Sequence, residues 1–445
     1  MLVNKTAITH EARRQWQLAL PLVTGLLIAV LPGIVDTVLL APLGTVALAA
    51  ASITTTTLII FYSCLYGMVS PVGVLAGQAY GASEPQAIGQ VLHHGVPLAL
   101  AAGLFGAALM AAFYPLLPYL NQPQEVVSQM KHYWLWMCAM LVPFCMKLVY
   151  KSILDSTNRA WTATGLMLIT PIANGLLAYG LIYGAFGLPQ MGLTGAGVAS
   201  FLGSLIGLWG LQAYFRFAPA MQPYRTHQPY AWAHFKKQLR EGVPIALQYL
   251  LEGGAVAVAG VLIGWLGAAA LAANQIVLST MSFLYMLPLG MASAVTIRMA
   301  QAVGEKRRGD FRLIGFTGLG LTTLWMLVTT AALVIAAKPL AAFFTADSEV
   351  QMIAATLFVV VALMQVFDGM QSVSVGALRG LMDNDWPTVV SLISYWLIAL
   401  PFAYVLGFML NWQASGIWLG FGAGLLIASL AMIHRFMRLT DAQNA

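Results

Sequence analysis

Long apolar runs alternate with short polar segments along the whole chain, and this pattern predicts the elements of the fold. A run of about 20 apolar residues is long enough to cross roughly 30 Å of hydrocarbon as an α-helix. Since a helix also pairs its own backbone polar groups, which lipid cannot do, each run predicts a membrane-spanning helix. The polar segments leave no room for a sizeable soluble domain. The predicted spans are residues 16–40, 46–71, 92–117, 132–154, 161–183, 194–215, 242–264, 269–295, 313–336, 352–376, 388–409 and 414–434.

The composition agrees with this pattern. Of the 445 residues, 60% are hydrophobic and 8% are charged, and the mean hydropathy is +0.81. An ordinary soluble domain carries about a quarter charged residues, so that class is excluded. The predicted fold class is an all-α integral membrane protein with twelve transmembrane helices. Cys64, Cys138 and Cys145 lie inside apolar runs, which indicates buried packing residues and gives no disulfide or metal framework.

The basic residues predict the orientation of the chain. With twelve spans both termini lie on one side, and every Lys and Arg except Lys131 and Lys338 falls on that side. Because short cytoplasmic loops carry the excess of Lys and Arg, we expect both termini to be cytoplasmic and the protein to be a multi-pass protein of the inner (plasma) membrane. The net charge of +6 then indicates contact with anionic membrane lipid and gives no support to nucleic-acid binding.

An internal repeat divides the chain into two halves. A shift of 223 positions lays residues 21–81 on residues 244–304 without a gap, and about a third of the pairs are identical, as in "LGTVALAA" and "LGAAALAA". Six spans in each half give both halves the same orientation, so we expect two six-helix bundles related by a pseudo-twofold axis along the membrane normal. The predicted domains are an N-terminal lobe at 1–215, a charged cytoplasmic linker at 216–240 and a C-terminal lobe at 241–445.

Three carboxylates lie inside the predicted spans: Asp36, Glu252 and Asp368. A carboxylate at the bilayer centre costs about 2.5–3.5 kcal/mol on insertion scales, so each is a candidate functional residue. At about 1.5 Å per residue, Glu252 lies about 15 Å into its span, and Asp368 reaches a similar depth. Such a pair can bind a cation through oxygen ligands or exchange a proton, because burial disfavours the charged carboxylate. Interhelical hydrogen bonding without transport chemistry is the alternative.

Two glutamines accompany these acids. Gln248 lies one helical turn before Glu252, and Gln371 lies one turn after Asp368 on the same helix faces. Their side chains either complete the coordination of an ion or simply hydrogen-bond to the acids.

Asp36 is expected about 27 Å along its helix, near the outer headgroups, where a carboxylate costs little; Pro32 and the apolar run that follows favour a buried position instead.

Other candidate residues carry weaker signals. Asn174, in the fifth span, is the best local partner for Asp36, although a membrane asparagine can also simply join helices. Four residues near the expected cleft could form an adaptable apolar wall for varied ligands, or could be core packing: Met281, Phe283, Tyr285 and Met364. The sequence contains no GxxxxGK[ST] phosphate loop and no zinc motif, so we expect no ATP dependence, no cofactor and no enzymatic activity.

Several stretches together resemble the multidrug and toxic compound extrusion (MATE) transporters, in particular the NorM-type branch, over nearly the full chain. They are "LALPLV…GIVDTVLLAPLG", "VGVLAGQAYGA", "YGLIYGAFGLPQMGLTGAGVAS", "GVPIALQYLLEGG", "LGAAALAANQIVLSTMSFLYMLPLGMASAVTIRMAQAVGE" and "DGMQSVSVGALRG". The resemblance implies two six-helix bundles and an antiporter. It matches Asp36, Glu252 and Asp368 to family acids of the first, seventh and tenth helices, and Asn174 to a fifth-helix amide. Met364 and Ala178 stand where relatives carry polar side chains.

The functional hypothesis is therefore a secondary active antiporter. It would export cationic or amphipathic organic compounds in exchange for Na+ or H+ by rocker-switch alternating access, as a monomer. A lipid-linked precursor flippase of the same superfamily is the alternative, and a membrane-embedded enzyme ranks last. In the repeat, Asp36 aligns with Ala259 and Glu252 aligns with Ala29. We therefore expect one principal coupling site, at Glu252 and Asp368, and a separate site for a proton or substrate cation at Asp36.

Overall fold

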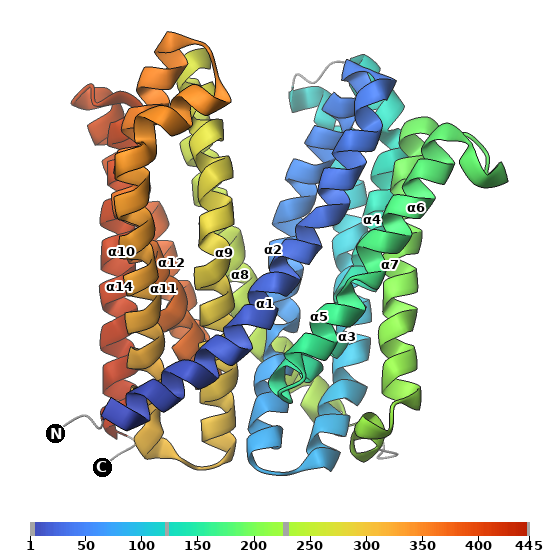
Figure 1. Ribbon diagram of the computed structural model, residues 1–445, viewed down its shortest axis with the longest axis vertical. Helices are drawn as coiled ribbons and strands as arrows, with labels where there is room; N and C mark the ends of the chain where they lie inside the picture. Colours follow the sequence, from blue (N-terminus) through green and yellow to red (C-terminus); the bar gives the residue numbers. More distant parts are fainter. Residues whose placement is uncertain (1–4, 121–123, 226–230, 443–445) are drawn as a thin grey trace. The chain divides into compact units, whose positions relative to one another are not determined.

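A computed structural model describes residues 5–120, 124–225 and 231–442, and every regular element in these ranges is helical. Twelve helical segments are long and apolar enough to cross a membrane (Figure 1), which confirms the predicted all-α fold with twelve spans. The helices are α1 (Lys5–Leu40), α2 (Thr45–Gly81), α3 (Pro85–Phe113), α4 (Gln124–Ser156), α5 (Ala160–Met167), α6 (Ile169–Tyr183), α7 (Gly192–Phe217), α8 (Trp232–Gly264), α9 (Ala268–Gly304), α10 (Phe311–Phe344), α11 (Ser348–Gly380), α12 (Asp385–Ser391), α13 (Leu400–Tyr404) and α14 (Gln413–Ala442).

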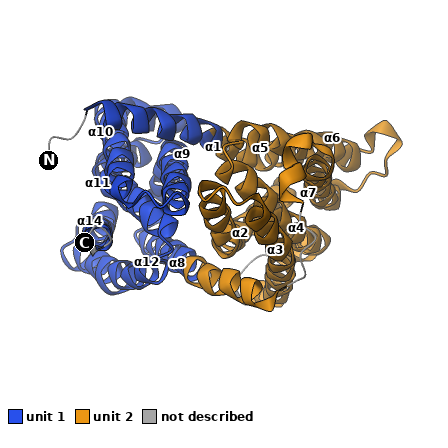
Figure 2. Cartoon of the chain, turned by 90° about the horizontal axis from the view of Figure 1, so that it is seen from below, with its two compact units in different colours: residues 1–23, 247–445 blue, residues 24–246 orange. Residues whose placement is uncertain are grey.

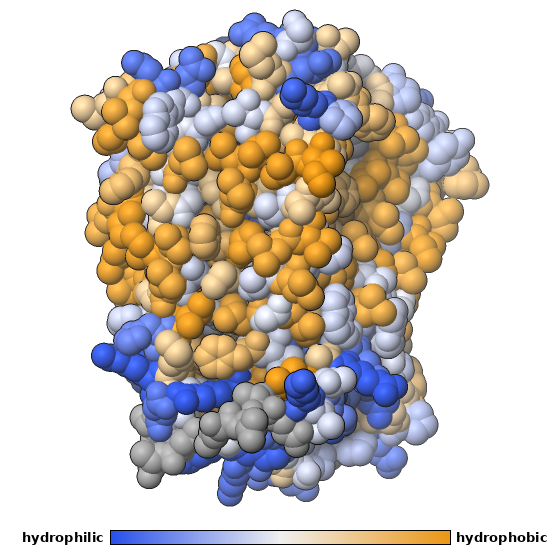
Figure 3. All heavy atoms as spheres, turned by 60° about the vertical axis from the view of Figure 1, so that its left-hand side comes forward, coloured by the Kyte–Doolittle hydropathy of each residue, from blue (hydrophilic) through white to orange (hydrophobic). Residues whose placement is uncertain are grey.

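Two of the spans are built from several pieces. Helices α5 and α6 together form the fifth span, 160–183. The eleventh span, 385–409, joins α12 and α13 to two π-helical segments, η6 (Leu392–Ala399) and η7 (Val405–Met409). Because π-helical turns are rare and often lie at functional sites, the eleventh span is of particular interest. The face drawn in Figure 3 carries hydrophobic side chains over its middle and hydrophilic ones toward its two ends, as a membrane-spanning surface requires.

The helices pack into two compact units, coloured separately in Figure 2. Unit 1 consists of Met1–Val23 and Leu247–Ala445, and unit 2 consists of Thr24–Ala246. In unit 1, α11 packs against α9, α10 and α14; in unit 2, α4 packs against α2, α3 and α7, and α6 packs against α7. Each unit has its own buried hydrophobic core.

The unit boundaries fall inside helices and follow the sequence repeat. Val23, in α1, and Ala246, in α8, are 223 positions apart, which is the shift of the repeat. The predicted lobes at 1–215 and 241–445, with a linker at 216–240, stay a prediction about the duplicated halves, and residues 226–230 of that linker lie outside the described residues. Packing groups the chain differently, since residues 1–23 belong with the C-terminal helices.

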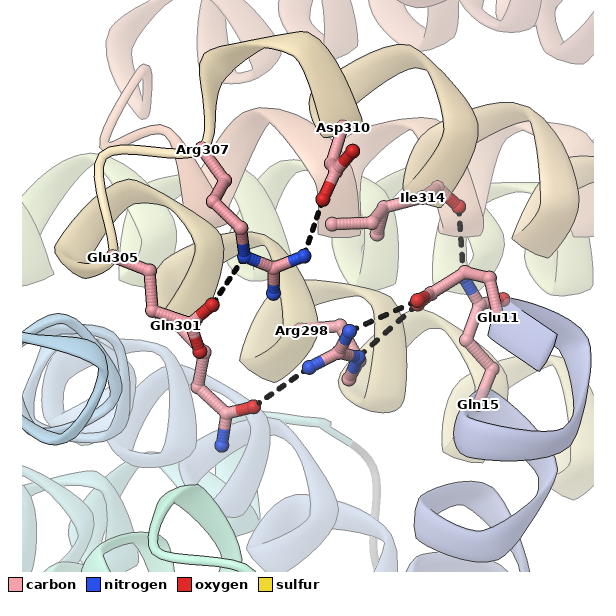
Figure 4. Close-up of polar contacts among 8 residues, drawn as sticks. All are labelled: Glu11, Gln15, Arg298, Gln301, Glu305, Arg307, Asp310 and Ile314. Carbon is pink, nitrogen blue, oxygen red and sulfur yellow. Dashed lines mark hydrogen bonds and ion pairs between the residues drawn. The ribbon is translucent and has the colours of Figure 1, made fainter. Parts of the chain in front are cut away.

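Polar contacts hold the start of α1 in unit 1 (Figure 4). The Arg298 guanidinium, on α9, donates to both carboxylate oxygens of Glu11, with Nε–Oε1 3.1 Å and Nη2–Oε2 2.9 Å, and both side chains are buried. Gln15 Nε2 donates to the carbonyl oxygen of Ile314 on α10 at 2.8 Å. These contacts fix one face of α1 against α9 and α10.

The start of α8 is held in unit 2 in a similar way. Gln238 Nε2 donates to the carbonyl oxygen of Val91 on α3 at 3.1 Å. Gly242 lies so close to α2 that a Cβ there would meet the Met68 carbonyl oxygen at 2.3 Å. Glycine is therefore required at this approach of two helices.

Candidate functional site

Glu252, on α8, is the centre of a hydrogen-bond network in unit 1. Its Oε1 accepts from Gln248 Nε2 at 2.9 Å, from Ser391 Oγ at 2.9 Å and from Gln371 Nε2 at 3.2 Å. Gln248 comes from the preceding turn of α8, Gln371 from α11, and Ser391 from the end of α12, where the π-helical segment η6 begins. Three donors from three elements on one carboxylate oxygen stabilise the ionised form of this side chain.

Asp368, on α11, lies in a second set of hydrogen bonds near this network. Its Oδ1 accepts from the Tyr285 hydroxyl at 3.0 Å, and that hydroxyl also contacts Ser372 Oγ. The carboxylates of Asp368 and Glu252 lie close enough to interact electrostatically, and both act on the Tyr395 hydroxyl. The structure thus brings together two acids that are 116 positions apart in the sequence, from Glu252 to Asp368.

Both predicted glutamines donate to Glu252, and their part in the coordination of an ion stays a prediction. Gln371 also pairs with Tyr395 of η6, with Nε2–Oη 3.0 Å and Oη–Oε1 3.1 Å. Gln248 accepts from Arg379 Nη2 at 3.0 Å through its Oε1.

Sequence reasoning missed Ser391, Tyr395 and Arg379. Ser391 and Tyr395 are four residues apart in an apolar run, a spacing that places them on one helix face, and this signal could have identified them. Arg379 lies beyond the predicted tenth span, 352–376, and its guanidinium reaches back to Gln248.

Asp36 lies in a second polar cluster, in unit 2. It is 7% exposed, and its Oδ2 accepts from Ser200 Oγ at 3.0 Å. Asn174 Nδ2 donates to the same Ser200 oxygen at 3.0 Å, and the Asn174 side chain also acts on the Asp36 carboxylate. Gly203 permits this arrangement, because a Cβ there would meet the Asn174 backbone nitrogen at 2.9 Å. Within the described residues, Asp36 Oδ1 and Asn174 Oδ1 are buried without a hydrogen-bond partner.

The four candidate wall residues occupy different environments. Met281 and Met364 are buried in the hydrophobic core of unit 1, in agreement with the packing alternative. Phe283 is 57% exposed, and Tyr285 is committed to Asp368. Their assignment to a substrate cleft stays a prediction.

The donor set limits the chemistry of the unit 1 site. In the part of the chain that the structure describes, no three His, Cys, Asp or Glu side chains gather in a way that could hold a metal ion. A cation at Glu252 and Asp368 would therefore need amide, hydroxyl or carbonyl oxygens in addition to the carboxylates. A proton would need the two acids alone.

Comparisons with known proteins converge on one family. The family model described as MatE matches residues 21–180 and 244–405. A probable multidrug resistance protein NorM of Synechococcus sp. is 29% identical over 99% of this chain and 96% of that protein. One with the same name from Xylella fastidiosa is 31% identical over 98% of this chain and 93% of that protein.

Solved structures agree with this match at the level of the fold. The Vibrio cholerae MATE transporter VcmN in its bent form gives a TM-score of 0.89 at 20% identity and covers 99% of both chains. The eukaryotic MATE transporter AtDTX14 gives 0.88 at 19% identity, over 98% of this chain and 99% of that one. Both matched segments of the family model begin at the repeat, since 21 and 244 are the first aligned positions of the two halves.

Proposed function

The chain belongs to the MatE family, a family of membrane transporters, and from this premise we propose that it is a secondary active antiporter. It exports cationic or amphipathic organic compounds across the inner (plasma) membrane, with both termini in the cytoplasm, as a monomer. Influx of Na+ or H+ drives the export. The names of the curated relatives, probable multidrug resistance proteins, support varied organic substrates for this chain as well.

One observation carries the proposal: two carboxylates, Glu252 and Asp368, lie inside membrane spans, close enough to interact electrostatically, and each accepts hydrogen bonds from buried side chains. Acids that only join helices need not lie near each other. Two carboxylates that do lie near each other repel when both are ionised, and this repulsion disfavours the doubly ionised pair. A pair that gains or loses one positive charge changes this balance. An ion or proton bound there would therefore favour one conformation over another, as coupling requires.

The mechanism that follows is alternating access by a rocker-switch movement. Binding of the coupling ion at Glu252 and Asp368 favours the outward-facing form and weakens the binding of a cationic substrate. Asp36 acts as a separate site in unit 2, for a proton or for the substrate cation. Its support is the unpaired Oδ1 oxygens of Asp36 and Asn174, since a proton on a carboxyl group supplies the donor that such buried oxygens lack.

The test uses the full chain in proteoliposomes with ethidium as the organic cation. The Na+ gradient and the pH gradient are imposed separately, so that the driving ion is identified. Glu252→Gln and Asp368→Asn should reduce uphill ethidium transport to the level of protein-free vesicles, because neither side chain can then exchange charge. The matched control is Glu349→Gln, an exposed acid near the start of α11, which should transport as the unaltered protein does. Uphill transport by both site variants at normal protein levels would refute the proposal.

A further inference from the structure

Arg379, in the last turn of α11, lies one side chain away from Glu252. Its Nη2 donates to Gln248 Oε1 at 3.0 Å, and Gln248 Nε2 donates to Glu252 Oε1 at 2.9 Å. An arginine, an amide and a carboxylate thus form a continuous chain of hydrogen bonds. Gln248 is 2% exposed, so the amide is shielded from solvent that could offer it other partners.

The chemistry of arginine fixes the orientation of this amide. A guanidinium offers donors and no acceptor, so the atom of Gln248 that faces Arg379 must be the carbonyl oxygen. The amide nitrogen then faces Glu252. Arg379 is itself held by Tyr249: its Nη1 donates to the Tyr249 hydroxyl at 3.0 Å, and the guanidinium carbon lies 4.9 Å from the centre of that ring. In this arrangement Gln248 presents no oxygen to an ion at Glu252.

Gln371, the other glutamine on Glu252, is not constrained in this way. Its second partner is the Tyr395 hydroxyl, which accepts from Nε2 at 3.0 Å and donates to Oε1 at 3.1 Å. A hydroxyl can play either part, so the Gln371 amide can turn over without losing that partner. Gln371 is therefore adaptable when Glu252 changes charge, and Gln248 is fixed.

We propose that Arg379 is a positioning residue of the coupling site, which keeps Gln248 as a permanent hydrogen-bond donor to Glu252. This inference rests on the proposed function in assigning Glu252 to coupling. A fixed donor stabilises the ionised carboxylate and so opposes proton binding. Arg379 acts through Gln248, because it fixes which end of the amide faces the carboxylate.

Other groups also act on Glu252. Among the described residues, the titratable and charged groups that face it are Asp368 and Arg379 from α11, Tyr285 from α9 and Tyr395 from η6. The charge of Arg379 also acts on Glu252 through space. The experiment must therefore separate the orientation of the amide from the charge.

The measurement is an infrared pH titration of the full chain in lipid vesicles without substrate. The signal is the carboxylic-acid band that disappears in Glu252→Gln. In Arg379→Met and in Gln248→Met, the midpoint of this band should move upward by about one pH unit, a tenfold change in proton affinity. Arg379→Lys keeps a donor-only cation and should restore the original midpoint. Combining Arg379→Met with Gln248→Met should shift the midpoint no further than the larger single change, because Arg379→Met lets the amide turn away and Gln248→Met removes it, so both take away the same fixed donor.

A matched arginine serves as the control. Arg435, also in unit 1, stacks on Trp386 at 5.2 Å from the ring centre and donates to Asp383 Oδ2 at 2.8 Å. Arg435→Met should leave the midpoint unchanged. The inference is overturned if Arg379→Met leaves the midpoint in place, or if no carboxylic-acid band disappears in Glu252→Gln. It is also overturned if the shifts of Arg379→Met and Gln248→Met add in full in the double variant, because the effect of Arg379 would then come from its charge. Uphill ethidium transport by both Glu252→Gln and Asp368→Asn would refute the proposed function instead, and the infrared result could still be interpreted.

Discussion

Lys147, on α4, is a buried lysine whose contacts are hydroxyl groups. Its Nζ donates to Thr170 Oγ1 and to Ser204 Oγ, each at 3.2 Å, and the residue is 3% exposed. Hydroxyls give an ammonium group no compensating negative charge, and a lysine inside a span costs about 2.5–3.5 kcal/mol on insertion scales. The hydroxyls themselves can bond to carbonyl oxygens of their own helices. This lysine therefore lowers the stability of unit 2.

We expect Lys147→Met to stabilise the protein by about 1–3 kcal/mol, because Met keeps the shape of the side chain and removes the buried charge. The measurement is the thermal unfolding temperature of the purified protein in detergent. Lys131→Met, at an exposed position of the same helix, is the control and should change little. A lower unfolding temperature for Lys147→Met would mean that the amine is held by interactions stronger than two hydroxyl contacts.

The sequence predicted the acidic and amide residues of both sites because such residues are rare in apolar runs. Asp36, Glu252 and Asp368 are conspicuous for this reason. Ser200 is not conspicuous, since serine is common in membrane helices and its role depends on a partner from another helix. Ser391 is marked only by its spacing of four residues from Tyr395. Glu11 precedes the first predicted span, and its burial against Arg298 depends on a contact 287 residues away in the sequence.

Contacts between pairs of helices depend on glycines at a few positions. A Cβ on Gly376, in α11, would lie 2.5 Å from the Ala292 carbonyl oxygen of α9. The backbone carbonyl cannot move aside as the end of a flexible side chain can. The two helices must therefore move apart to make room for the methyl group of an alanine at this position. The same two helices carry Asp368 and Tyr285, and their spacing sets the distance between these side chains.

We expect Gly376→Ala to destabilise unit 1 by about 1–3 kcal/mol and to lower ethidium transport. Gly320, in α10, is the control, because nothing lies within 4 Å of a Cβ there. Gly320→Ala should be neutral or stabilising by up to about 1 kcal/mol, the difference in helix propensity. Unfolding temperature and transport, measured on both variants, check the pair of outcomes. Equal behaviour of the two variants would argue against close packing at Gly376.

The existence of the helices was predictable from hydropathy, and their ends and irregularities were not. The first span was predicted to begin at residue 16, whereas α1 begins at Lys5. Hydropathy marks where the apolar, lipid-facing part of a helix ends. The helical backbone hydrogen bonds can continue beyond that point into polar residues. The division of the fifth span near Leu168 has a signal in Pro171, whose ring cannot donate to the carbonyl four residues earlier. The π-helical turns around Tyr395 leave the apolar pattern unchanged, and hydropathy does not mark them.

The stability of unit 1 as a whole depends on the ion pair that attaches the start of α1. Removing one partner of a buried pair leaves the other charge uncompensated, so Arg298→Met and Glu11→Gln should each cost about 3–5 kcal/mol. The double substitution Glu11→Met with Arg298→Met leaves no unpaired charge and should cost less than either single change.

Thermal unfolding of the three variants checks this order. Arg307→Met is the control, because Arg307 pairs with Glu305 and Asp310 at a partly exposed position (Figure 4), where ion pairs contribute about 1 kcal/mol or less. A double variant less stable than both single variants would show that the pair contributes more than it costs to bury.

The unit boundaries at Val23 and Ala246 mean that the two halves of the duplicated sequence have exchanged arms. The first half lends residues 5–23 to the unit formed by the second, and the second half lends residues 232–246 to the unit formed by the first. This is the arrangement of a domain-swapped dimer whose protomers have become one polypeptide. Each arm is therefore part of one continuous helix that begins in one unit and continues in the other.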